Sequence, residues 1–126
     1  MGKTNFGTVF EDDATTEELT GTKTLDEEDV GKILTVKTDA FVITLPATVV
    51  GYVYHIVNTG EDGANIITVS PNASDKIMGP DRTDVDDKDI INTKATAKKG
   101  DRITLFGDGS LGWYVISQVG TWAAEA

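Results

Sequence analysis

The sequence predicts an all-β fold, an antiparallel β-sandwich or jelly-roll-like barrel of about seven or eight short strands. Short runs rich in β-branched residues alternate with turn residues roughly every ten positions. No segment keeps a helical period over about ten residues, so no long helix is expected. The 126 residues suffice for one domain with a hydrophobic core of its own.

The first strands are expected after a helical turn. Residues 25–31 (LDEEDVG) indicate one helical turn that ends at a glycine. The run 32–38 alternates between two faces, as a half-buried strand does. The next run, 41–45, ends at Pro46, because proline has no N–H group to donate to a neighbouring strand.

The later strands are marked by glycine-rich turns. The run 52–58 alternates and is followed by a turn with two glycines at 59–63, which predicts a hairpin into a strand at 66–69. A second glycine-rich segment, 107–110, also indicates a hairpin turn. The remaining short strands are expected at 76–79, 89–92, 102–106 and 113–117.

Composition divides the chain into an extended acidic N-terminal arm, residues 1–24, and a β-sandwich domain, residues 25–126. The formal net charge is −10. Residues 1–30 hold nine carboxylates and two lysines, and residues 81–89 hold five carboxylates and two cations, so these two segments carry the whole net charge. Such runs are typical of solvated surface. This charge does not favour binding to a nucleic-acid backbone.

Several classes of site are not expected. The chain has no cysteine, so it can form no disulfide or thiolate zinc site, and its single histidine, His55, cannot build a histidine metal cluster. No Gly-x-Ser-x-Gly nucleophile elbow occurs. No apolar run reaches the roughly 18 residues of a membrane span. We expect no enzymatic activity, no cofactor and no membrane partner.

The acidic loop 81–89 is the one candidate metal site. Asp84, Asp86 and Asp89 offer oxygen ligands at short spacing, which suits calcium. The loop lacks the glycine and the closing glutamate of an EF-hand. A solvated loop remains the stronger interpretation, and metal is expected to be dispensable.

Two sets of apolar side chains are candidates for contacts. Phe6, Val9 and Phe10 stand in an otherwise polar arm, which either folds back on its own domain or becomes ordered on a partner surface. The second set consists of aromatic residues of the strands, which are expected in the core or in contacts between copies of the chain. Its members are Tyr52, Tyr54, Trp113 and Trp122.

Short motifs follow one another in a particular order between residues 25 and 122. They are LDEEDVGK at 25–32, TLPA at 44–47, ITV at 67–69, DKIMG at 75–79, GDRITL at 100–105, GWYVI at 112–116 and GTW at 120–122. Their order resembles a small β domain of tailed bacteriophages, which occurs in head decoration (cement) proteins, head fibres and tail-fibre tips. The resemblance covers about three-quarters of the chain.

The resemblance implies a structural protein of the virion. Decoration proteins of this family assemble as homotrimers on the outer surface of the capsid, where they clamp neighbouring major capsid subunits. In this chain the arm residues Phe6, Val9 and Phe10 are the expected capsid contacts, and synthesis is expected in the bacterial cytoplasm. The N-terminal arm and the absence of a repetitive shaft favour decoration, and the alternative is a receptor- or glycan-binding fibre tip.

Overall fold

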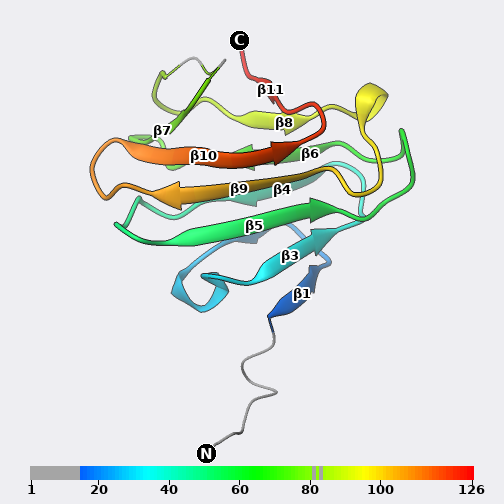
Figure 1. Ribbon diagram of the computed structural model, residues 1–126, viewed down its shortest axis with the longest axis horizontal. Helices are drawn as coiled ribbons and strands as arrows, with labels where there is room; N and C mark the ends of the chain where they lie inside the picture. The colour runs from blue at the N-terminus through cyan, green and yellow to red at the C-terminus, as the bar shows by residue number, and fades with distance from the viewer. Residues whose placement is uncertain (1–14, 81, 83) are drawn as a thin grey trace, which may run out of the picture.

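The computed structural model describes residues 15–80, 82 and 84–126, which form a sandwich of two β-sheets (Figure 1). The order in the six-stranded sheet is β1-β3-β5-β9-β10-β7, and in the five-stranded sheet it is β11-β8-β6-β4-β2. The strands are β1 (Thr16–Leu19), β2 (Lys23–Thr24), β3 (Ile33–Val36), β4 (Phe41–Thr44), β5 (Val53–Asn58), β6 (Ile67–Ser70), β7 (Lys76–Met78), β8 (Ile90–Asn92), β9 (Arg102–Gly107), β10 (Gly112–Val119) and β11 (Ala123–Ala124). The helical segments of the described residues are single 3-10 turns at Glu27–Asp29 and Lys94–Thr96.

The predicted all-β sandwich is confirmed, but its sheets are mixed and not purely antiparallel. Strands β1, β3 and β5 run parallel in one sheet, and β2, β4 and β6 run parallel in the other. The antiparallel pairs join β5 to β9, β9 to β10, β6 to β8 and β8 to β11. The structure has eleven strands where seven or eight are expected, because some strands are too short to give a recognisable pattern in the sequence.

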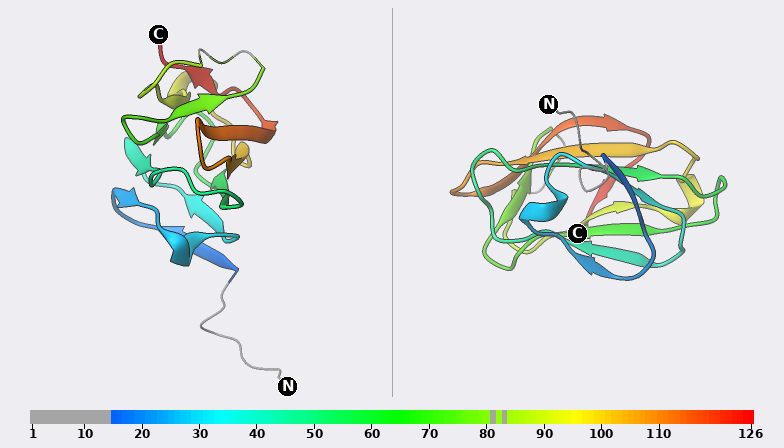
Figure 2. Two further views of the ribbon diagram at one scale, coloured as in Figure 1. Left: turned by 90° about the vertical axis from the view of Figure 1, so that its left-hand side faces the viewer. Right: turned by 90° about the horizontal axis from the view of Figure 1, so that it is seen from below.

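The parallel pairs arise because the chain changes sheet at every step from β1 to β9. Successive strands therefore lie in opposite layers, which Figure 2 shows from below. From β1 to β6, a strand returns to its own sheet after a full turn of this winding and enters in the same direction as its neighbour, whereas β8 returns beside β6 in the opposite direction. The predicted hairpin from 52–58 into 66–69 is wrong for this reason, since β3 and β9 occupy both sides of β5. The predicted turn at 107–110 does form a hairpin, which joins β9 to β10.

The β domain begins before the predicted boundary at Leu25. Strand β1 pairs with β3 along its length, and its Leu19 is buried in the core. Strand β2 pairs with β4. Residues 16–24 therefore belong to the sandwich, although the sequence predicts an arm as far as residue 24. Strands β1 and β2 are short and contain a single buried residue, Leu19 of β1. Their alternation is therefore too weak to be recognised in the sequence.

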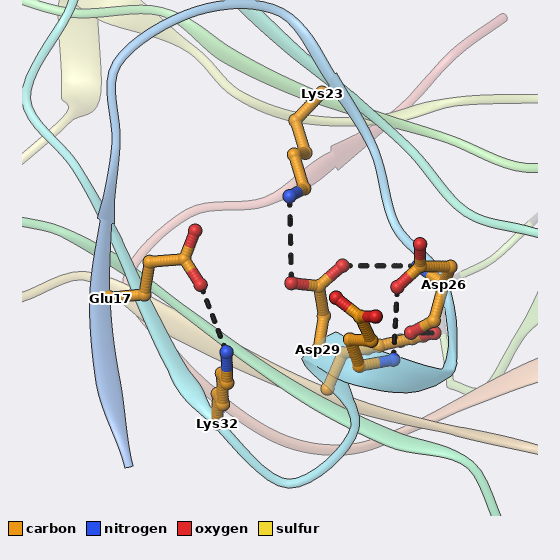
Figure 3. A network of polar contacts seen from close by, with 7 residues as sticks. Glu17, Lys23, Asp26, Asp29 and Lys32 are labelled. Atoms are coloured by element: carbon orange, nitrogen blue, oxygen red, sulfur yellow. Dashed lines mark hydrogen bonds and ion pairs between the residues drawn. The ribbon is translucent and has the colours of Figure 1, made fainter. Parts of the chain in front are cut away.

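Polar contacts fix these N-terminal strands (Figure 3). The Lys32 ammonium, directly before β3, lies 3.1 Å from a Glu17 carboxylate oxygen of β1. The Lys23 ammonium of β2 lies 3.7 Å from the buried carboxylate of Asp29. Asp29 also accepts a hydrogen bond from the Asp26 amide at 3.1 Å, so it closes the turn that precedes β3. The acidic motif at 26–29 thus has a structural role.

The core lies between the sheets and follows the alternation of the sequence. Leu34 and Val36 share one face of β3, and Tyr54 and Ile56 share one face of β5, as the alternation predicts. All four side chains are fully buried. The neighbouring positions point to the opposite face of the same sheet. Within the described part of the chain, no helix has the length and apolar character that crossing a membrane requires.

Candidate assembly surfaces

Three of the four predicted aromatic contact residues belong to the core. Tyr54 and Trp113 have no exposed surface, and their ring centroids lie 5.4 Å apart. Trp122 is 3% exposed, and its indole N–H donates to the Val119 carbonyl at 3.1 Å. Tyr52 is half-buried and packs edge-on against Tyr54. The core interpretation therefore holds for Tyr54, Trp113 and Trp122, which leave no surface for a second chain.

The hydroxyl of Tyr54 has a structural partner. It donates to the backbone carbonyl of Asp26 at 2.8 Å. Burial, with a smaller contribution from the charge of Asp29, raises the pKa of Tyr54 above its ordinary value. This phenol stays protonated and anchors the 3-10 turn to the six-stranded sheet.

Phe6, Val9 and Phe10 lie outside the described residues. Described structure begins at Thr15, five positions after Phe10, and the Thr15 carbonyl accepts a hydrogen bond from the Ile33 amide at 2.6 Å. The expected capsid contacts therefore precede the edge strand β1 in the chain.

The acidic loop does not bring its described carboxylates together. The Asp86 carboxylate lies 2.6 Å from the Lys76 ammonium, and the Asp89 amide donates to Glu125 at 2.9 Å. Burial raises the pKa of Asp89. Across residues 15–80, 82 and 84–126, no group of three His, Cys, Asp or Glu side chains has an arrangement that could hold a metal ion.

The outer face of the six-stranded sheet carries few charges, and about half of its side chains are apolar. We use "outer face" for the side chains of β1, β3, β5, β9 and β10 that point away from the core. The strand register arranges them in three cross-strand rows. The rows are Val53, Phe106, Tyr114; then Thr16, Ile33, His55, Thr104, Ser117; then Glu18, Thr35, Val57, Arg102, Val119.

Large apolar side chains on the outer face reach solvent. Ile33 is 41% exposed, Val119 is 42% exposed and Tyr114 is 37% exposed. Tyr114 stacks on Phe106 with ring centroids 5.3 Å apart. Surfaces of this kind mark sites of protein–protein contact when they are contiguous.

A shallow depression of about 310 Å³ lies within the outer face. Thr15, Ile33, His55 and Arg102 are among the residues that line it. The Nδ1 atom of His55 is 3.0 Å from the Thr104 hydroxyl oxygen, which fixes the imidazole ring on the sheet. The depression can receive a side chain from a partner.

The β9–β10 hairpin ends in a turn whose shape is fixed by Asp108. One carboxylate oxygen of Asp108 accepts the amides of Ser110, Leu111 and Gly112 at 2.8, 2.9 and 3.0 Å. These hydrogen bonds, with that of Gly112 the strongest influence, hold the pKa of Asp108 below its ordinary value. The turn presents Leu111, which is 50% exposed.

We expect Asp108→Ala to lower the thermal unfolding midpoint by a few degrees at neutral pH, because three amides lose their acceptor. A depressed carboxyl pKa stabilises the fold above the ordinary aspartate pKa, and this contribution disappears as pH falls through the lowered value. The difference between the variant and the unaltered chain should therefore shrink in acid. Calorimetry across pH measures it, with Asp108→Asn as the control that keeps an acceptor oxygen. A difference independent of pH would contradict the assignment.

The outer face is not among the contact surfaces that the sequence predicts. The signal lies in β5 and β9, which carry apolar residues such as Val57 and Phe106 at positions opposite to the core. A strand with one face in water normally alternates apolar and polar residues.

Comparison of the chain with protein-family models, with curated proteins and with solved structures gives no match.

Proposed function

We propose that this chain is a structural decoration (cement) protein, which binds the outer surface of a bacteriophage capsid and stabilises the head by clamping neighbouring major capsid subunits. The observation that carries the proposal is an outer face with few charges and several exposed apolar side chains in a chain of net charge −10, because such a face suits a protein that assembles with other protein chains. The motif order at 25–122 resembles that of phage head decoration proteins, and this resemblance supports a capsid as the partner. The role is structural and involves no catalytic step.

The charge distribution supports an outer location. Carboxylates occupy the loops and the N-terminal segment, and on the outer face Glu18 is balanced by Arg102. An acidic protein has no attraction for packaged DNA, whereas a basic patch on the capsid would attract it. A homotrimer on the capsid multiplies weak contacts through avidity.

We expect deletion of residues 1–14 to weaken capsid binding by about 100-fold, because burying each of Phe6 and Phe10 is worth roughly 1.5–3 kcal/mol. The deletion must end before β1, since a longer one removes the core residue Leu19. Co-sedimentation with empty capsids measures the binding, and added salt should weaken the binding of the unaltered chain.

The triple variant Phe6→Ala/Val9→Ala/Phe10→Ala is the matched control, because it keeps the length and the charge of the segment. It should bind as weakly as the deletion while its unfolding midpoint stays unchanged. Capsid binding of both variants at the level of the unaltered chain would assign the contact to the β domain.

A fibre tip that binds a receptor or a glycan is the second candidate function. The half-exposed stack of Phe106 and Tyr114 favours it, since sugars bind on aromatic faces. A glycan array separates the two candidates. Saccharide binding that Tyr114→Ala abolishes, together with no binding to capsids, would replace the proposed function with this one.

A further inference from the structure

The outer face has the charge pattern of a surface that contacts a second copy of itself. Two chains of net charge −10 repel each other, and a contact surface that is close to neutral keeps this repulsion lowest, because it brings no like charges together. The three rows of the outer face contain one carboxylate, Glu18, and one guanidinium, Arg102, while His55 is hydrogen-bonded to Thr104. The rest of the face is apolar or hydroxylic.

The two charges stand at opposite sides of one row. Register places Glu18 beside Thr35, Thr35 beside Val57, and Val57 beside Arg102. Three strand spacings separate the ends, about 14 Å in total. Glu18 contacts Lys37 at 3.7 Å, but both side chains are exposed and such a pair contributes little.

We propose that the outer face is the contact between copies of this chain, with the β1–β3 side of one copy packed against the β9–β10 side of the next, so that Glu18 lies opposite Arg102 of its neighbour. The inference rests on the proposed function only in that self-assembly is part of it. The exposed Ile33 of one copy then meets Thr104 and Ser117, which occupy the same row on β9 and β10 of the next copy. The same arrangement repeated around an axis closes a ring.

The small area of the outer face is consistent with a contact that needs several copies of the chain. Five strands at about 4.8 Å spacing and six residues at about 3.3 Å rise span roughly 20 Å by 20 Å. Such a face is about half the roughly 800 Å² that each partner contributes to a standard interface. A ring, in which each copy uses both sides of the face, or a capsid that concentrates the copies, favours the contact.

The first experiment tests the contact at Ile33. Ile33→Glu should weaken self-association by about tenfold or more, since it places an unpaired charge in the contact. Val85→Glu is the matched control, because Val85 is 49% exposed in the β7–β8 loop and lies outside the outer face. Mass by light scattering and sedimentation measures the association. Equal masses for both variants across the concentration range in which the unaltered chain associates would overturn the proposal.

The second experiment uses the absence of native cysteine. In the double variant Glu18→Cys/Arg102→Cys the two thiols of one copy are about 14 Å apart, whereas a disulfide needs Cα atoms within about 7 Å. Oxidation can therefore link only separate copies. The matched control is Val42→Cys/Ala123→Cys, which also lies three strands apart in one row, on the five-stranded sheet. We expect covalent oligomers from the first pair and monomers from the second, both in free protein and on capsids.

Two outcomes separate this inference from the proposed function. If the outer-face pair links no more copies than the control pair while the chain still binds capsids, the inference fails and the proposed function stands. If the outer-face pair links copies efficiently and the chain binds no capsid, the surface assignment stands and the proposed function fails.

Discussion

Replacing Asp101 with alanine is expected to lower the free energy of unfolding by about 3–5 kcal/mol, because it leaves buried donors without an acceptor. Asp101 is 4% exposed, and one of its oxygens accepts hydrogen bonds from Asn92 Nδ2 at 3.0 Å and from the Lys98 amide at 2.9 Å. Asn92 accepts in turn from Asn58 Nδ2 at 2.8 Å. This buried network connects β5, β8 and the start of β9, and thus both sheets.

Urea denaturation of Asp101→Ala gives this loss, and Asp62→Ala is the matched control. Asp62 also accepts a backbone amide, that of Lys99 at 2.8 Å, but in an exposed position. Water can replace the acceptor there, so the control should lose less than about 1 kcal/mol. Equal losses in the two variants would show that burial of the network contributes nothing.

Trp113→Ala is expected to cost about 3–5 kcal/mol, because it opens a large cavity between the sheets. The Trp113 side chain has no exposed surface and packs on Tyr54. The less drastic Trp113→Phe should cost clearly less. Among the described residues the buried indole Nε1 has no hydrogen-bond partner, so phenylalanine removes an unpaired donor together with some packing.

Chemical denaturation of both Trp113 variants tests this expectation. The unfolding transition followed by far-UV circular dichroism gives both free energies, and Trp122 remains as a fluorescence probe in each variant. A loss for Trp113→Phe as large as that for Trp113→Ala would mean that the indole N–H contributes to stability after all.

Most strands and the alternation of their two faces could be predicted from the sequence, but the partners of most strands could not. The alternation in β5 correctly places Tyr54 and Ile56 on one face, and burial in the structure shows that this face points inward. Alternation defines a face of a strand, and it carries no information on which of two sheets the strand joins. The turn at 59–63 contains the glycines of a hairpin, yet the chain crosses to the other sheet there, because both edges of β5 are occupied.

The candidate surface was predictable only in part. Aromatic side chains in strands fit a core and a contact equally well, and burial of Tyr54 and Trp113 resolves that ambiguity. The outer face combines residues from five strands that are spread along the chain between Thr16 and Val119. It depends on the register between those strands, which follows from the winding of the chain. Local sequence therefore could not reveal it.

The alternation of the chain between sheets has a consequence for folding kinetics. In a meander, each strand pairs with its sequence neighbour across a short loop, so most contacts form locally. Here Ile33 pairs with His55 and Phe41 with Ile67, so the parallel ladders close only after long segments have been ordered. High contact order of this kind slows the search for the native state. The β9–β10 hairpin is local and can form early, whereas β1 pairs with β3 alone and should open first in hydrogen exchange.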